Sequence, residues 1–210
     1  MSNKNKGVSL KELRETYYKL RSFEISNLWQ RSIFLSAIIV IFFTAYGYLV
    51  KEFMNKETND LILNEICCFL ALFGFIFSII WIMMAKGSKA WYEVYENNIC
   101  TIEKEKKLNI SQKYLMGKQC TPFNLDSNIF TGNAGKYSVS RLNIFIGQIL
   151  TLIWFIIMSI HYVGSIICFN CNDHFLAIIS IIILTIIPIA FLFVLITAIC
   201  NKWAKSGSLK

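Results

Sequence analysis

Four long apolar stretches alternate with polar segments along the chain. They cover residues 32–50, about 66–85, about 142–163 and about 175–199, and none contains Asp, Glu, Lys or Arg. Each is long enough to cross the hydrocarbon core of a bilayer, roughly 30 Å, as an α-helix. The pattern therefore predicts an all-α polytopic membrane protein with four transmembrane helices and helical extensions outside the membrane.

These spans divide the chain into five predicted parts. In order, they are an amphipathic helix at 1–31, a first transmembrane hairpin at 32–85, a stalk and basic loop at 86–141, a second transmembrane hairpin at 142–199 and a tail at 200–210. In the second span, Gly74 and Ser78 are spaced as a small-xxx-small pair, which predicts a close helix contact.

An amphipathic helix is predicted before the first span. Ser9 and Glu12 have the spacing of a capping box, and Leu10, Leu13 and Tyr17 then recur on one helical face. This face either lies on a lipid surface or packs on the protein's own helices. We favour packing on the protein, because the apolar face is narrow and glutamates interrupt its polar side.

The second span continues without proline into a charged and aromatic segment, which predicts one helix that leaves the membrane as a stalk. Here Trp91 and Tyr95 are i,i+4 neighbours, as are Lys89 and Glu93. A partner or oligomer interface is predicted on this stalk, formed by Lys86, Lys89, Trp91, Tyr92 and Tyr95. The alternative is an aromatic and basic belt at the membrane surface, with ordinary helix packing.

Basic residues are distributed unevenly between the polar segments. Of the 21 Lys and Arg residues, 19 fall in 1–31, 86–141 and 200–210, and the other two segments carry two basic against five acidic residues. By the positive-inside rule, both termini and the 86–141 loop are cytoplasmic and face anionic membrane lipid.

The third span carries mild polarity on one side, from Gln148, Thr151 and Ser159, with Phe155 between them. This side could line a narrow pore with Phe155 as a hydrophobic gate. It could equally form hydrogen-bonded contacts between helices. We favour helix contacts, because the polarity is mild and no ionisable Asp, Glu, Lys or Arg lies within any span, as ion-coupled transport usually requires.

Two further local features belong to the second hairpin. Pro188 lies inside the fourth span and predicts a helix kink, because proline removes a backbone donor. Cys168 and Cys171 lie in the short loop between the third and fourth spans. This loop either carries a local disulfide or is a plain polar connector.

The 86–141 segment is the largest polar part of the chain. Its nine basic residues are interleaved with aromatic residues, a composition that can bind nucleic acid or a nucleotide. The positive-inside rule alone predicts the same surplus, so this reading is not favoured. The charged run from Glu103 to Lys107 is interpreted as a solvated turn. Gly132 to Lys136 lacks the full spacing of a phosphate-binding loop, which excludes a P-loop nucleotide triphosphatase.

No arrangement of Ser, His, Cys or carboxylate residues has the spacing of a catalytic site or a metal-dependent hydrolase. We therefore expect a protein that is not an enzyme and needs no cofactor. Its expected partners are membrane lipid, further copies of itself and a cytoplasmic protein.

The stretch K-G-S-K-A-W-Y-E at 86–93, at the exit of the second span, completes a layout of amphipathic helix, two spans, basic insert and two more spans. This layout resembles the small four-span membrane proteins of bacterial anti-phage defence systems, such as the membrane subunit of Kiwa and the transmembrane effectors of nucleotide-signalling systems. The resemblance implies a homo-oligomer in the bacterial inner membrane.

The leading hypothesis is a defence protein that acts as a membrane scaffold or gated pore and responds to a partner or ligand through residues 86–141. Two alternatives remain open. One is a small ion channel or transport accessory subunit unrelated to defence. The other is a membrane signalling or interaction protein that conducts nothing.

Overall fold

The structure is a computed structural model of the 210-residue chain. It describes residues 8–55, 61–111, 115–116, 125–126, 128, 130–131, 133, 135, 137–169, 182, 186, 190 and 194. The remaining positions, among them the tail at 200–210, lie outside the described residues.

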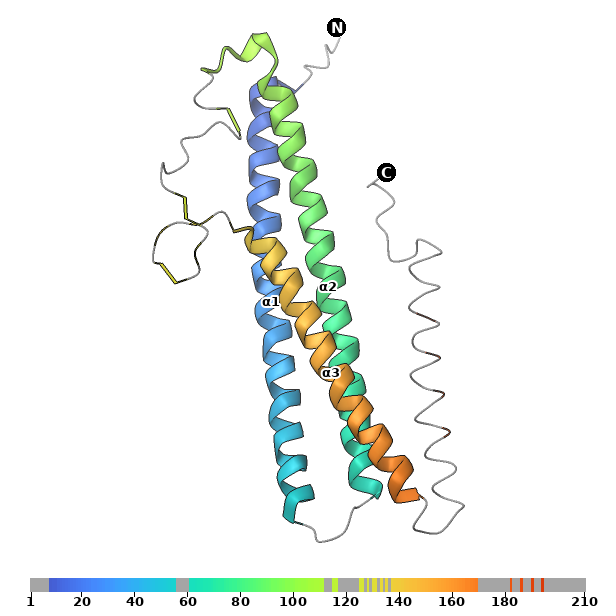
Figure 1. Ribbon diagram of the computed structural model, residues 1–210. Helices are drawn as coiled ribbons and strands as arrows, with labels where there is room; N and C mark the ends of the chain where they lie inside the picture. The colour runs from blue at the N-terminus through green and yellow to red at the C-terminus, as the bar shows by residue number, and fades with distance from the viewer. Residues whose placement is uncertain are drawn as a thin grey trace, which may run out of the picture. The chain divides into compact units, whose positions relative to one another are not determined.

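The described chain is helical and contains no strand. Its elements are helix α1 (Leu10–Asn55), helix α2 (Leu61–Glu103), the short 3-10 helix η1 (Lys106–Leu108) and helix α3 (Val139–Phe169) (Figure 1). Within the described residues, α1, α2 and α3 are each long and apolar enough to cross a membrane. The all-α prediction is confirmed for this part of the chain, and the first three predicted spans are helices. Most of the predicted fourth span lies outside it.

Two compact units make up the chain. The first, here called the polar unit, comprises Met1–Arg31 and Met84–Leu142. The second, here called the membrane unit, comprises Ser32–Met83 and Asn143–Lys210 and holds the apolar parts of the three long helices.

In the polar unit, helix α1 begins at the predicted capping box. The Ser9 amide donates to Glu12 Oε2 at 3.0 Å, and the Glu12 amide donates to Ser9 Oγ at 3.2 Å. These reciprocal bonds satisfy two amides at the helix start that have no intrahelical partner. The bond from the Ser9 amide, followed by one from its hydroxyl, holds the pKa of Glu12 below its usual value. The sequence prediction of the helix start is confirmed.

The first part of α1 packs antiparallel on the last part of α2 within the polar unit. Arg14 pairs with Glu103 and Arg21 pairs with Glu96, so the α2 number falls by seven as the α1 number rises by seven. Seven residues are two helical turns, so each helix presents one face to the other. The prediction that the amphipathic helix packs on the protein's own helices is confirmed.

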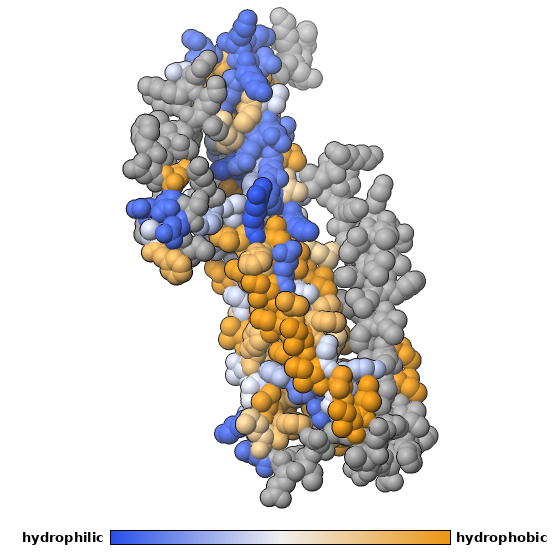
Figure 2. All heavy atoms as spheres, viewed as in Figure 1, coloured by the Kyte–Doolittle hydropathy of each residue, from blue (hydrophilic) through white to orange (hydrophobic). Residues whose placement is uncertain are grey.

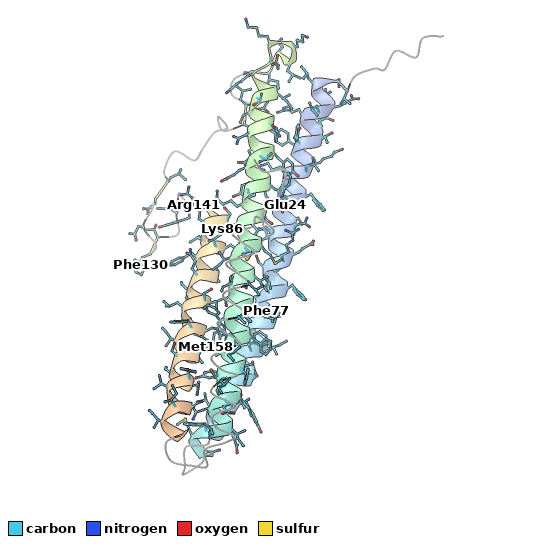
Figure 3. All side chains as sticks on the ribbon, turned by 90° about the vertical axis from the view of Figure 1, so that its right-hand side faces the viewer. Glu24, Phe77, Lys86, Phe130, Arg141 and Met158 are labelled. Carbon is cyan, nitrogen blue, oxygen red and sulfur yellow. The ribbon has the colours of Figure 1, made fainter. Side chains whose placement is uncertain are left out.

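In the membrane unit, the three helices pack around Trp154 of α3, which is 0% exposed. Its ring stacks on Phe43 with centroids 4.5 Å apart, and Phe42 and Tyr46 meet it edge to face at 6.4 and 6.2 Å. Phe42 also contacts Phe77 of α2, which is labelled in Figure 3. Such aromatic contacts add specific geometry to the dispersion that holds membrane helices together.

Gly74 on α2 makes room for this indole. A Cβ at Gly74 would overlap the six-membered ring of Trp154. One turn later, the buried Ser78 hydroxyl donates to the Gly74 carbonyl at 2.7 Å, so its polarity is satisfied within the helix. The close helix contact predicted at Gly74 and Ser78 is confirmed, and it is made by Trp154 of α3.

Candidate functional site

The polar unit contains a buried carboxylate at the end of α2. The Glu103 side chain is 2% exposed, and its Oε1 accepts from Arg14 Nε at 2.8 Å and from the Tyr18 hydroxyl at 3.2 Å. Its Oε2 accepts from the Met116 amide at 2.6 Å. Both carboxylate oxygens are therefore hydrogen-bonded, as a buried charge requires.

Glu103 was interpreted from sequence as the start of a solvated turn, and this interpretation is wrong. The turn begins one residue later, and Glu103 itself lies on the α2 face that packs on α1. Burial, and then the nearby Glu103 carboxylate, raise the pKa of the Tyr18 hydroxyl above its usual value. Tyr18 therefore stays protonated and continues to donate to Glu103 at neutral pH.

Met116 connects this cluster to the long polar segment that follows α2. Besides the amide bonded to Glu103, its carbonyl accepts from Cys100 Sγ at 3.9 Å. Met116, 13 residues after the end of α2, is thus attached back to the last turn of that helix.

A second attachment lies where the same segment enters α3. The Tyr92 hydroxyl and the buried Ser140 hydroxyl are 2.6 Å apart, and Ser138 Oγ is 3.1 Å from Ser140 Oγ. A groove of about 490 Å³ adjoins this point, lined by side chains that include Arg21, Trp29, Tyr92, Glu96 and Ser140. The groove combines aromatic rings, hydroxyl groups and a paired Arg–Glu, so it can accept a polar side chain or a small ligand.

The predicted stalk residues all lie on the part of α2 within the polar unit. Lys89 pairs with Glu93, and Trp91 stacks on Tyr95 with centroids 5.9 Å apart, as their i,i+4 spacing predicted. Tyr95 in turn contacts Tyr17 of α1 at 6.2 Å. Lys86 lies on the same helix and is exposed (Figure 3). Tyr92 and Tyr95 thus make contacts within the chain, and the predicted interface role of these residues stays a prediction.

Arg31, the last residue of α1 in the polar unit, connects α1 to α2. Its guanidinium donates to the buried Ser88 hydroxyl at 2.9 Å and to Glu24 at 3.4 Å. Glu24 lies on α1, as Figure 3 shows. The positive charge of Arg31 is thus paired with Glu24 and hydrogen-bonded to Ser88.

In the membrane unit, two small hydrogen-bonded clusters each join all three helices. In the first, Asn143 of α3 accepts from Trp81 Nε1 at 2.9 Å and donates to Ser32 Oγ of α1 at 2.7 Å. A carboxamide can donate and accept at once, so one residue satisfies groups on two helices. Polar bonds of this kind stabilise helix association in a bilayer by up to about 1–2 kcal/mol.

The second cluster is centred on His161 of α3, which is buried. Its Nε2 is 3.1 Å from the Tyr46 hydroxyl of α1, and its Nδ1 is 3.0 Å from Asn64 Oδ1 of α2. Because the Asn64 oxygen only accepts, Nδ1 carries the hydrogen and Nε2 accepts from the Tyr46 hydroxyl. Gly164 adjoins Asn64 so closely that a Cβ would lie 2.9 Å from the carboxamide oxygen.

The predicted polar side of α3 divides into two pairs of residues. Thr151 and Ser159 donate to the carbonyls of Gly147 and Phe155 on their own helix, each at 2.8 Å. Gln148 and Phe155 are exposed, Phe155 by 49%. The Phe155 ring contacts Phe75 of α2 with centroids 6.1 Å apart, and its other half lies on the outer surface of α3 with the Gln148 amide.

Three other predicted positions are not described at the side-chain level. Pro188 and Cys171 lie outside the described residues, as does the side chain of Cys168, whose backbone belongs to the last turn of α3. Among the described residues, no cluster of three or more His, Cys, Asp or Glu side chains could hold a metal ion.

Sequence reasoning missed the ion pairs Arg14–Glu103 and Arg21–Glu96. A signal was present, because two arginines and two glutamates are each seven residues apart on helices of opposite direction. Like charges repeated every seven residues on one helix, facing the opposite charges at the same spacing on another, are typical of paired helices. The clusters around Asn143 and His161 had no comparable signal, because single polar residues within spans do not indicate their partners.

The octameric membrane protein family matches the chain over residues 11–163, which covers α1, α2 and most of α3. No curated protein sequence and no solved structure matches the chain. The three apolar helices indicate a membrane protein, and the family match indicates that it is homo-oligomeric. The chain belongs to the octameric membrane protein family.

Proposed function

We propose that eight copies of the chain assemble in the bacterial inner membrane and that the assembly acts in anti-phage defence. In this proposal the polar unit lies in the cytoplasm and receives a protein partner or ligand through residues 86–141. The membrane unit is a scaffold or gated pore that responds. Octamer formation is supported by the family match. The orientation is supported by the positive-inside rule, because 19 of the 21 basic residues lie in 1–31, 86–141 and 200–210.

The observation that carries the responsive role is that the polar segment after α2 is attached back to α2 at two points. Its Met116 amide binds the buried Glu103, and Ser140, at its other end, binds Tyr92. A partner that moves the segment would therefore act on α2 at Glu103 and at Tyr92, and on the first turn of α3 at Ser140.

The test uses a strain that carries the gene with its neighbouring genes and is challenged with phage. Wild type is expected to lower the plaque count. Tyr92→Phe keeps the ring and removes the hydroxyl that contacts Ser140, so it is expected to lose protection while the protein remains inserted and oligomeric. Lys19→Gln, at an exposed position on α1 outside residues 86–141, is the control and is expected to protect.

Deletion of the gene separates defence from the alternatives. If deletion leaves the plaque count unchanged for every phage tested, the defence role is wrong. Dye release from liposomes containing the purified protein then distinguishes a channel from a non-conducting interaction protein.

A further inference from the structure

The outer face of α1 in the membrane unit has no partner within the described chain. Its exposed positions recur every three or four residues through the span and are Ile33, Phe34, Ser36, Ala37, Val40, Ile41, Thr44, Gly47 and Tyr48. Tyr48 is 70% exposed. This face mixes large apolar side chains with small residues, as membrane helices do where another helix packs against them.

Gly47, on this outer face, has different surroundings from the other glycines of the membrane unit. Cβ atoms at Gly74, Gly147 and Gly164 would each meet a neighbouring helix of the same chain. At Gly47, nothing lies within 4 Å of a Cβ. Glycine inside a helix costs about 0.5–1 kcal/mol relative to alanine, and no close approach within the described chain accounts for that cost here.

The two hydroxyl groups on the α1 outer face are bonded to their own helix. Ser36 Oγ donates to the Ile33 carbonyl at 2.7 Å, and Thr44 Oγ1 donates to the Val40 carbonyl at 2.9 Å. Their hydrogens are therefore used, while the oxygens can still accept a bond. Beside Thr44, α1 and α2 enclose an apolar groove of about 710 Å³, whose lining includes Val40, Ile41, Tyr48 and, on α2, Ile66 and Leu70.

The outer surface of α3 offers the complementary groups. Gln148 is exposed in a span, where an unpaired amide is costly, and it can donate to a hydroxyl oxygen. Ser32 is level with Asn143 and Tyr46 is level with His161, so α1 and α3 run in the same direction.

Counting from the level of Ser32 and Asn143, Ser36 lies four residues further along α1 and Gln148 lies five residues further along α3. They therefore lie at matching depth. By the same count, Phe155 is about level with Ile41, at the α1–α2 groove. In a ring with its axis along the membrane normal, every copy has the same depth, and the contact between neighbours joins two different faces.

We propose that the outer face of α1 in one copy packs against the Gln148–Phe155 surface of α3 in the next copy, with the Gln148 amide donating to Ser36 Oγ and Phe155 entering the α1–α2 groove. Figure 2 shows the hydrophobic side chains along α3 in the membrane unit. The inference rests on the octamer proposed above. A second copy is the occupant because the match to the octameric family covers α1 and this part of α3 and ends at residue 163, before the fourth apolar stretch.

The test is disulfide cross-linking between copies in native membranes. The double variant Ser36→Cys/Gln148→Cys, once oxidised, is expected to give a ladder of two, three and more chains on a non-reducing gel. Each single variant controls for the native cysteines. Ser36→Cys/Ser159→Cys is the depth control and is expected to give no ladder, because 11 residues along α3 displace the second cysteine by roughly 16 Å, beyond the reach of a disulfide.

Native mass spectrometry of the same preparations separates the two proposals. If the protein is octameric and the Ser36/Gln148 pair gives no ladder, or only a bond within one chain, this interface is overturned while the octamer stands. If the unmodified protein is a single chain, the octamer itself is wrong. A ladder from the Ser36/Gln148 pair that is absent from the depth control supports the interface.

Discussion

The polar unit and the membrane unit use the same two helices, α1 and α2, but different interactions hold them together. In the polar unit, pairs such as Arg14–Glu103 and Arg21–Glu96 join the helices. In the membrane unit, aromatic rings around Trp154 and single polar residues such as Asn143 and His161 do so. Water can solvate a broken ion pair, whereas lipid cannot solvate a broken polar contact, so each unit has the interactions its surroundings allow.

In the polar unit, the Glu103 carboxylate that pairs with Arg14 also accepts from the Met116 amide, so an ion pair and the segment after α2 share one group. In the membrane unit, close packing at Gly74 and Trp154 holds the three helices together, and the outer faces of α1 and α3 are exposed.

The largest effect is expected at Gly74 of the membrane unit. Gly74→Leu forces the Trp154 ring out of its position and should destabilise the membrane unit by about 3 kcal/mol or more. Its counterpart in the polar unit is Gly87→Ala, which meets nothing within 4 Å and should be neutral or stabilise the helix by about 0.5–1 kcal/mol. Unfolding by increasing SDS, followed by circular dichroism, measures both. Equal stability of the two variants would contradict the packing described.

A smaller effect is expected at Glu103 of the polar unit. Glu103→Ala leaves Arg14 without its partner and frees the Met116 amide, at a cost of about 2 kcal/mol, because Arg14 is partly exposed and can be solvated. Glu96→Ala breaks a pair in which both side chains are a third exposed, and it should cost less than about 1 kcal/mol. Hydrogen exchange should therefore rise through residues 10–31 in Glu103→Ala and change little in Glu96→Ala. The reverse order would show that burial does not separate the two pairs.

Within the membrane unit, the His161 cluster should contribute less than Trp154 packing. Tyr46→Phe removes the hydroxyl that binds His161 Nε2 and keeps the ring against Trp154, so a loss of about 1 kcal/mol is expected. The same SDS titration measures it. A loss as large as that of Gly74→Leu would mean that polar contacts, and not packing, dominate this unit.

The smallest effect is a pH dependence at Tyr18 of the polar unit. Because its pKa is raised in the folded protein, its contribution to stability is present below its usual pKa of 10.0 and is lost as pH rises through the folded value. Wild type should therefore lose more stability than Tyr18→Phe above about pH 10. Thermal unfolding at pH 9 and above, with both proteins in the same detergent, measures the difference. Parallel curves would contradict the bond to Glu103.

Sequence periodicity predicted much of this fold, since helix start and span length depend on local residue order. The capping box at Ser9 and the stacking of Trp91 on Tyr95 both involve neighbours within about one turn. At Gly74 the small-residue spacing predicted a close contact, but not its partner, Trp154 of α3. By contrast, the bond between Glu103 and Met116 joins a helix end to an irregular segment, and the His161 cluster joins three helices. Such contacts depend on how helices pair, which no single-helix pattern specifies.

Native mass spectrometry of wild type beside Glu103→Ala, both in lipid nanodiscs, tests the central claim most directly. In our proposal, copies assemble through the membrane unit, and the polar unit receives the partner. Both proteins are therefore expected at eight times the chain mass of 24.3 kDa. A single-chain mass for wild type would contradict the octamer, and dissociation of Glu103→Ala alone would place assembly in the polar unit instead.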